Sequence, residues 1–473
     1  MPSLLPSLPA PADAGFQPDA RTEACTEPAV GAAVGAAALP EASTDAATKA
    51  KSAARDAVHR ARPDVVGLSH QLHANPELAF QEHRSARATS DLLERHGFTV
   101  ERGVADLPSA FVATAGEGEL VIGVCAEYDA LPEVGHACGH NVIAAAAVAA
   151  GIALAQVAAD AGIRVKVFGT PAEEAGGGKI IMLEAGVFDG VHAAMMVHPS
   201  TGEYADHYAR AVIDLAVTYT GRTAHAALAP HQGINAGDAV TVAQVAVGLL
   251  RQQLRPGALV HGIVTRAGES ANSTPGSAEM VYAARANTVA ELEDVRRQLE
   301  QCFEAGALAT GAALTVTEQS RVFSEFINDE AMVGFYRANA EALGRTFDSG
   351  PVAARMAEAA STDMGNISRV IPSIHPLLRI DAHGASNHQP GFARWCAGPD
   401  GDKAAVDGGI AMAWTAIDLA FDPAQRERLL AGRVGAPEES ACGLSGPRIA
   451  VIQPYGGRSG TNDAVNLPRH RPE

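Results

Sequence analysis

Cysteine and uninterrupted apolar sequence are both scarce in this chain. Six cysteines are scattered over 473 residues without the close spacing of a disulfide framework. Such usage suits a reducing compartment, where cysteines serve metal binding or catalysis. No stretch offers eighteen uninterrupted strongly apolar residues, and the N-terminus lacks a basic region followed by an apolar one. The sequence therefore predicts neither a membrane-spanning helix nor a signal peptide, and we expect a cytoplasmic protein.

Positive charge is also in short supply. The chain has 36 Lys and Arg residues against 54 Asp and Glu residues, a formal net charge of -18. Nucleic acids and anionic membrane surfaces would repel such a protein, so we expect neither as a partner and favour a small-molecule substrate. With 47% apolar residues, a chain of this length can bury large cores and is expected to form about two or three domains.

Both ends of the chain look peripheral. Residues 1–46 are rich in Ala and Pro without apolar periodicity, which predicts a flexible tail. Residues 423–473 are polar and punctuated by Gly and Pro, which predicts a peripheral extension. Within it, the apolar stretch 449–452 is expected either to add a strand or to dock on the body of the protein.

Residues 47–208 and 325–422 have the pattern of a layered α/β domain. Short apolar runs typical of strands buried on both faces alternate with helical segments. The first segment predicts two helices with a break at Asn75-Pro76. The expected strands are 120–126, 165–169 and 193–197, and the expected helices are 141–161, 179–185, 330–343 and 404–420.

Residues 209–324 show a different order of elements. The prediction is a strand at 213–220, a helix at 236–254, strands at 260–266 and 278–286, a helix at 289–308 and a strand at 314–318. This β-α-β-β-α-β order is the split unit of ferredoxin-like domains. The predicted fold is therefore an α/β domain into which a ferredoxin-like domain is inserted.

The run His136-Ala137-Cys138-Gly139-His140 concentrates metal-binding side chains. In a tight turn that contains Gly, Cys138 and His140 can both face one ion, at about 2.0 to 2.3 Å. A buried cysteine with two hydrogen-bonded histidines is the simpler alternative. The residues that follow the predicted strands favour metal binding.

Acidic residues and histidines come just after those strands, where open α/β sheets bind ligands. Asp129 is placed to orient a histidine without touching metal. Glu173 and Glu174 are adjacent and must point apart, so one can bind metal while the other moves protons during metal-assisted hydrolysis. His198 and His388 are further candidate ligands. Taken alone, each of these residues is also compatible with a turn acid or a structural histidine.

At these residues the chain resembles the family of two-metal peptidases and amidohydrolases that includes aminoacylases, carboxypeptidase G, hippurate hydrolase and the plant auxin-conjugate amidohydrolases. The resemblance covers roughly residues 50–420 and is strongest at 136–141, at 170–178 and in the inserted domain. The Cys-Gly-His turn belongs to one branch of this family. The runs 127–132 and 361–366 look most like the aminobenzoyl-glutamate hydrolases and the β-alanyl-lysine-type dipeptidases.

The resemblance implies a site with two divalent metal ions per chain, Zn or Mn. The ligand set that it implies is Cys138 as the shared ligand, with His140, Glu174, His198 and His388. It also implies that Glu173 is the general base. The thiolate favours Zn, although Mn, Co and Ni also occupy mixed N/O/S sites.

The resemblance further implies a homodimer. In this family the inserted domain packs against its partner and lends residues across the interface. His225 matches the family histidine that helps hold the developing oxyanion, in the neighbouring subunit's site, and Asn272 matches an asparagine near the substrate's carboxylate. From the residues alone, a packing histidine is the less favoured alternative for His225, whereas Asn272 could equally be a turn residue.

Three residues depart from the family pattern or are not used by it. Glu127 stands where much of the family has an orienting aspartate, and Cys125 where the peptidases place a metal-binding histidine. We expect Cys125 to be a core residue that does not touch metal. Glu127 and His136 are expected to orient neighbouring groups rather than to bind metal.

These features predict hydrolysis of an amide bond in a small N-acyl amino acid or dipeptide by a metal-activated water. The alternative within enzymes is a dipeptidase acting on β-alanyl-type dipeptides, for which Asp363 is a candidate to meet the substrate's ammonium group. The alternative from another class is a non-catalytic family member that binds a small molecule. The presence of Glu173 argues against it, because a binding protein needs no proton-shuttling acid.

Overall fold

The computed structural model describes residues 41–351, 355, 359–432 and 449–452. Helix α1 spans Glu41–Ala74, so residues 41–46 belong to a helix and not to the predicted tail, of which 1–40 lie outside the described residues. The chain breaks after α1 at Asn75-Pro76 as predicted, and α2 follows at His83–Arg95. Of the predicted extension, α12 (Pro423–Leu430) and β13 (Ile449–Ile452) are described, while 433–448 and 453–473 are not.

The α/β domain is built on a six-stranded sheet with the order β1-β2-β4-β3-β5-β11. Its strands are β1 (Thr99–Arg102), β2 (Phe111–Ala115), β3 (Leu120–Ala126), β4 (Ile163–Gly169), β5 (Ala193–Met195) and β11 (Ser373–Ile374). β3 runs parallel to both β4 and β5, and β5 runs parallel to β11. β1 and β2 form an antiparallel edge, in which β2 pairs with β4.

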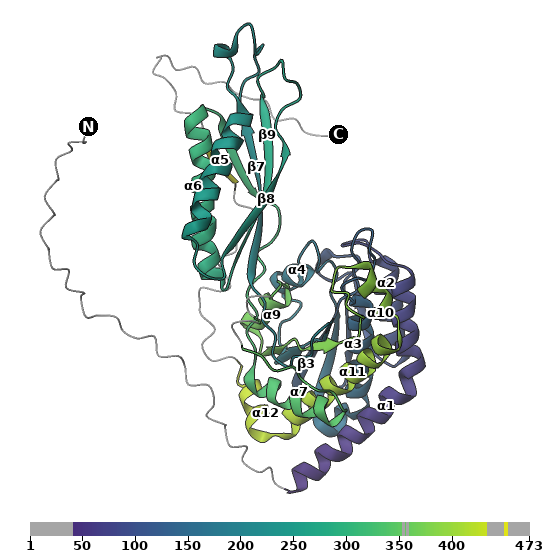
Figure 1. The fold of residues 1–473 in the computed structure, drawn as a ribbon. Coiled ribbons are helices and arrows are strands. Elements are labelled where there is room, and N and C mark those ends of the chain that lie inside the picture. The colour runs from purple at the N-terminus through teal and green to yellow at the C-terminus, as the bar shows by residue number, and fades with distance from the viewer. Residues whose placement is uncertain (1–40, 352–354, 356–358, 433–448, 453–473) are drawn as a thin grey trace, which may run out of the picture. The chain divides into compact units, whose positions relative to one another are not determined.

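Helices cover both faces of this sheet. Along β3, Ile122 and Val124 belong to the core shared with α1, α3 (His140–Ala161) and α11 (Pro399–Phe421), while Val121 and Cys125 belong to the core shared with α4 (Gly178–Glu184) and α9 (Met364–Val370). α3 packs against α1 and α11 (Figure 1). The remaining elements are η1 (Val104–Asp106), β6 (His198–Ser200), α7 (Glu330–Ala342), β12 (Leu377–Arg379) and α10 (Pro390–Cys396).

Two core helices are long and strongly apolar. By length and composition α3 and α11 would each suffice to cross a membrane, and 83% of the apolar window of each is buried inside the protein. Neither helix has eighteen uninterrupted strongly apolar residues, because Gln156 interrupts α3 and Asp407 interrupts α11. Their apolar character is explained by burial on all sides, as in the central helices of large cores.

The inserted domain has the predicted order of elements. They are β7 (Ala211–Thr220), η2 (Pro230–Gln232), α5 (Ala236–Leu250), η3 (Arg251–Gln253), β8 (Leu259–Arg266), β9 (Ser277–Ala286), α6 (Val289–Thr310) and β10 (Ala313–Glu318). The sheet has the order β13-β10-β7-β9-β8, so the stretch 449–452 adds a strand beside β10. α5 and α6 cover one face and close a separate apolar core (Figure 1). β8 is left as an edge strand.

Candidate metal centre

The loops that follow β3, β4 and β5 meet at one edge of the sheet. β3 and β4 end in register, with Ala126 opposite Gly169, and β5 runs beside β3. The side chains at this edge are Glu127 and Asp129 after β3, Glu173 and Glu174 after β4, and His198 after β5. Parallel pairing therefore gathers residues that lie far apart in the sequence at the place where such sheets bind ligands.

Gly139 sets the turn that carries the thiol. It begins α3 with a φ of +88°, and a Cβ at this position would lie 2.8 Å from Cγ of Pro199. Any other residue would be strained here and would collide with Pro199. The turn leaves Sγ of Cys138 3.4 Å from Nε2 of His198. Burial lowers the pKa of His198 to about 4, so its imidazole is neutral and able to act as a ligand.

His140 is oriented by a carboxylate, as the sequence analysis expected of Asp129. Nδ1 of His140 lies 2.9 Å from Oδ1 of Asp129, which leaves Nε2 free of any hydrogen bond although the ring is fully buried. Nε2 faces the carboxylate oxygens of Glu127, Glu173 and Glu174, at 3.5, 3.9 and 3.7 Å. Burial alone would lower the pKa of His140, but Asp129 raises it well above its usual value. The surrounding carboxylates favour a positive charge at Nε2 of His140. Either a proton or a metal ion can supply it, and the two compete for this nitrogen.

Glu174 and His388 face each other on the other side of the thiol. Oε1 of Glu174 lies 3.6 Å from Nε2 of His388 and is buried without a hydrogen bond. The backbone N–H of Glu174 donates to Oδ2 of Asp129 at 3.0 Å, so one aspartate fixes both Glu174 and His140. His388 adopts a left-handed backbone, with φ of 68°, and its N–H donates to the carbonyl of Ala137 at 2.9 Å. Its side chain is 56% exposed, which places it at the mouth of the cluster.

The structure thus brings all five expected ligands together. Their ligand atoms lie within 4.8 Å of one another in two groups that share Cys138: Cys138 with His140 and His198, and Cys138 with Glu174 and His388. A third group joins Glu127, His140 and Glu173. The facing lone pairs that lack partners, and the mixture of thiolate, imidazole and carboxylate, fit two divalent ions that share one thiolate. The Cys138–His140–His198 group and the Cys138–Glu174–His388 group would each hold one ion.

Glu173 is held between two clamped peptide groups. The preceding residue, Ala172, has a positive φ of 57°, and its N–H donates to Oε1 of the buried Glu82 at 2.9 Å. The following N–H, that of Glu174, is held by Asp129. Burial raises the pKa of Glu173 well above its usual value, and the neighbouring Glu127 adds to the effect. A carboxyl group whose pKa is raised above its ordinary value holds a proton more readily, which favours a role in proton transfer. Sequence analysis missed Glu82, which lies far from every motif.

Lys179 is the second residue that sequence analysis missed. It is fully buried, and its Nζ donates to Glu127 and, at 2.6 Å, to Oδ1 of Asp363. The backbone N–H of Lys179 holds the other oxygen of Asp363 at 3.0 Å. Asp363 therefore has a partner inside the protein, contrary to the expectation that it could meet a substrate's ammonium group. The available signal was a lone lysine that opens an apolar helix after three glycines.

Cys125 and His136 lie beside the cluster without joining it. Cys125 is fully buried in the core on the α4 side of the sheet, and burial raises the pKa of its thiol to about 12. His136 is buried and stacks on His73 with ring centroids 6.4 Å apart, and burial lowers its pKa to about 3. Neither belongs to a group of potential ligands among the described residues.

The inserted domain brings His225 and Asn272 next to each other. The N–H of Ala226 donates to the carbonyl of Asn272 at 2.9 Å, and His225 forms a bridge with Ser273. Both His225 and Asn272 are exposed. Nδ1 of His225 accepts from the N–H of Ala227 at 3.2 Å, which leaves Nε2 as its outward-facing nitrogen. In the part of the chain that the structure describes, no hydrogen bond or ion pair joins His225 or Asn272 to the metal-binding cluster.

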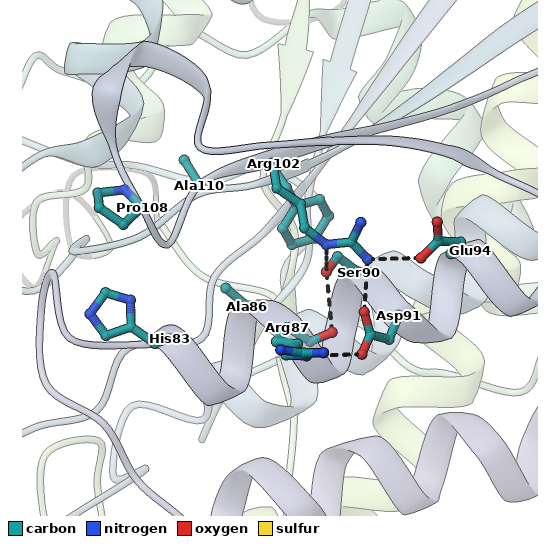
Figure 2. A pocket seen from close by; sticks show the side chains of 10 residues that line it. His83, Ala86, Arg87, Ser90, Asp91, Glu94, Arg102, Pro108 and Ala110 are labelled. Atoms are coloured by element: carbon teal, nitrogen blue, oxygen red, sulfur yellow. Dashed lines mark hydrogen bonds and ion pairs between the residues drawn. The ribbon is translucent and has the colours of Figure 1, made fainter.

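A cavity of about 470 Å³ between α2 and the β1–β2 edge lies apart from this cluster (Figure 2). Its basic side chains are already paired: Arg102 binds Asp91 at 2.7 Å and Glu94 at 3.0 Å, and Arg87 lies 3.5 Å from Asp91. The two positive and two negative charges offset each other, so the cavity has no surplus charge to select an ionic ligand. We assign the chemistry to the strand ends instead.

Comparison with known proteins agrees with this geometry. Residues 209–310 match the family model described as the peptidase dimerisation domain. The chain is 36% identical over 386 residues to the Xaa-Arg dipeptidase of Mus musculus, covering 79% of this chain and 89% of that one. It is 34% identical over 278 residues to one of the subunits of the p-aminobenzoyl-glutamate hydrolase of Escherichia coli K12, covering 54% of this chain and 57% of that one. The fold resembles that of a Bacillus subtilis protein described as a dinuclear metal-binding peptidase of the M20 family, with a TM-score of 0.57, 22% identity, and 76% and 98% of the two chains covered.

Proposed function

This chain belongs to the M20 family of metal-dependent peptidases and amidohydrolases, and from that premise we propose that it hydrolyses dipeptides by means of Glu173 and a two-metal centre. Hydrolysis of a dipeptide or another small amide is the activity for which its relatives are named. The observation that supports the proposal most is the convergence of five ligand atoms on Cys138, with Glu173 beside them.

The proposed roles follow from the contacts. Two divalent ions, when bound, supply the Lewis acidity that polarises a scissile carbonyl and lowers the pKa of water. Zn or Mn is proposed, because a mixed sulfur, nitrogen and oxygen set accepts both. Glu173 accepts the proton of the attacking water and delivers it to the leaving nitrogen, since its clamped turn and raised pKa suit both steps. His225 donates from Nε2 to the oxyanion.

The role of His225 requires a homodimer, which we also propose. The edge strand β8 exposes Leu259 and Ile263, which are 47% and 64% accessible, and α5 exposes Leu249, which is 72% accessible. Unpaired edge strands with apolar side chains are suited to pairing with a second copy. In the dimer, His225 of one subunit would complete the site built around Glu173 of the other. We keep the cytoplasm as the proposed location, from cysteine usage.

The substrate proposed first is a dipeptide whose C-terminal residue is basic. It rests on the extent of the match to the mouse Xaa-Arg dipeptidase, which covers 79% of this chain. The net charge of -18 also favours the approach of a cationic substrate. The aminobenzoyl-glutamate type of amide is the second candidate, supported by the match to the Escherichia coli hydrolase.

The test is product detection by mass spectrometry. Metal-loaded protein is given a mixture of Xaa-Arg and β-alanyl-Lys dipeptides, aminobenzoyl-glutamate and N-acyl amino acids, and a parallel sample contains a chelator. We expect chelator-sensitive release of Arg or Lys from the dipeptides. Release of glutamate alone would select the second candidate, and a metal-loaded protein that cleaves nothing in the mixture would contradict the proposed function.

A further inference from the structure

Glu127 has one oxygen that nothing in the described structure satisfies. Its side chain is 1% exposed and follows β3 directly. Oε1 accepts from Nζ of Lys179. Oε2 is buried without a hydrogen bond and lies 3.5 Å from Nε2 of His140, which is itself buried without a hydrogen bond. Two unpaired polar atoms thus face each other in a region closed to water.

The separation of these two atoms is that of neighbouring ligands rather than of a hydrogen bond. Nitrogen-to-oxygen hydrogen bonds in proteins span about 2.7 to 3.2 Å. Two ligands at about 2.0 to 2.1 Å from a tetrahedral zinc ion lie about 3.3 to 3.4 Å apart. Since Nδ1 of His140 is taken by Asp129, Nε2 presents the lone pair of the neutral ring. A carboxylate oxygen facing that lone pair is repulsive unless a metal ion, or a proton on the ring, lies between them.

Lys179 keeps the carboxylate of Glu127 in this orientation. The ammonium group of Lys179 is fully buried between the two carboxylates, and Asp363 is held a second time by the backbone N–H of Lys179. One ammonium between two carboxylates leaves one negative charge in excess. Asp363 is enclosed by its bonds to Lys179, whereas Glu127 directs its spare oxygen at His140. A buried excess charge of this kind requires a cationic partner.

We infer that Glu127 is a direct ligand, through Oε2, of the metal ion bound by His140, and does not merely orient its neighbours. The inference rests on the two-metal centre of the proposed function. A ligand at Glu127 would make the two metal positions unequal. Among the groups of potential ligands, Glu127 lies with His140 and Glu173, so its oxygen would join the ion bound by His140, whereas the group of Cys138, Glu174 and His388 gains no further ligand and lies beside the exposed His388 ring. A site with an open coordination place is the one that receives water or substrate.

Glu127→Gln tests the inference, and Asp363→Asn is its matched control. Both substitutions remove one carboxylate from the same buried ammonium, but only Glu127 faces His140. Each protein is stripped of metal and titrated with Co²⁺, and the readouts are ions bound per chain and the visible absorption of the bound cobalt. We expect Glu127→Gln to lower the affinity of one ion by more than about 100-fold, beyond the range typical of residues that only support a ligand, and to change the spectrum. Asp363→Asn should keep both ions and the wild-type spectrum.

The inference would be overturned if Glu127→Gln kept the wild-type metal affinity and cobalt spectrum. It would also be overturned if Asp363→Asn changed the affinity and the spectrum as much as Glu127→Gln does. If Glu127→Gln does not fold, Glu127→Asp replaces it, because it keeps the negative charge beside Lys179 while withdrawing the oxygen from His140. The same spectral change is then expected, and an unchanged spectrum is contradictory. Failure of the proposed function is distinguishable, because it would appear in the wild-type protein as an absence of bound metal or of hydrolysis.

Discussion

Two groups of buried charge in the α/β domain are built in opposite ways. In the first, around Arg345, the charged groups are matched: Arg345 binds Glu203 at 2.7 Å, Asp407 at 3.1 Å and the carbonyl of Arg379 at 2.9 Å. In the second, at the strand ends, Oε2 of Glu127, Nε2 of His140 and Oε1 of Glu174 are all buried without partners. Among the described residues, no polar atom of Glu203, Arg345 or Asp407 is buried in that unsatisfied state.

The contrast separates structural charge from functional charge. A buried ion pair whose hydrogen bonds are complete needs no ligand, and its role is structural. Buried acceptors that face each other without donors persist only if something absent from the polypeptide completes them. The strand-end cluster should therefore respond to metal, and the Arg345 cluster should respond only to unfolding.

Removing the shared thiol should break the strand-end cluster most severely. We expect Cys138→Ser to lower metal affinity by more than about 100-fold, because residues that only support a ligand are already worth about 10 to 100-fold. Hydrolysis should fall with metal content. Metal per chain, measured after desalting, checks the prediction. A Cys125→Ser variant is the control, since Cys125 lies in the core outside the ligand groups, and equal metal loss in both variants would contradict it.

Replacing the base should separate binding from chemistry within the same cluster. Glu173→Ala is expected to keep its metal and to lose about 100 to 10,000-fold in kcat, the range typical of general acid–base catalysis. The measurement pairs metal analysis with steady-state kinetics on the substrate found in the product screen. Full turnover by Glu173→Ala would refute the assignment of the base.

The sequence predicted the ligands better than it predicted their support. Cys138, His140 and His198 are local signals, because Cys138 and His140 flank the glycine of a turn and His198 follows a strand. Lys179, which pairs with Glu127 and Asp363, could not be found in the same way, because its partners are 52 and 184 residues away. The expectation that Asp363 could meet a substrate failed for this reason. In the fold Asp363 is bound by the buried Lys179, and nothing in the sequence near Asp363 indicates that partner. The order of strands and helices in the inserted domain was predictable, since β7 and β9 alternate between buried and less buried residues and the helices have their own core.

The matched cluster should give the complementary result. Arg345→Met leaves Glu203 and Asp407 without their cation and is expected to lower the free energy of unfolding by about 3 to 5 kcal/mol, while folded protein keeps its metal. Urea unfolding with metal analysis of the folded fraction checks both parts. Arg428→Met is the control, because its pair with Asp329 is 40% exposed on the arginine side and should be worth about 0 to 1 kcal/mol. If the folded Arg345→Met protein lost its metal, the Arg345 cluster could not be called purely structural, and the distinction between a structural and a metal-binding cluster would fail.

His225 extends the comparison to an exposed functional group. His225→Ala should lower kcat by about 100 to 1000-fold with unchanged metal content, as for the loss of one oxyanion donor, whereas His231→Ala, on the same exposed segment, should not. Mixing His225→Ala with Glu173→Ala gives a further test. If His225 serves the partner's site, heterodimers formed after subunit exchange contain one intact site and regain activity. Two inactive variants that stay inactive once heterodimers are demonstrated would contradict the cross-subunit role.

The smallest expected effect concerns a half-buried pair outside both clusters. Arg355 binds both oxygens of Asp206, at 2.7 and 2.9 Å. Burial alone would raise the pKa of Asp206, but Arg355 more than offsets it, and the pKa lies below its usual 3.8. A lowered folded-state pKa stabilises the protein above the unfolded value, and this stability is lost as pH falls through the folded one. The advantage of wild type over Asp206→Asn, about 1 kcal/mol for a partly exposed charged pair, should thus be complete above about pH 5 and shrink steadily below 3.8. Urea unfolding of both proteins across this range measures it, and an advantage that does not change with pH would show that the pair contributes no charge-dependent stability.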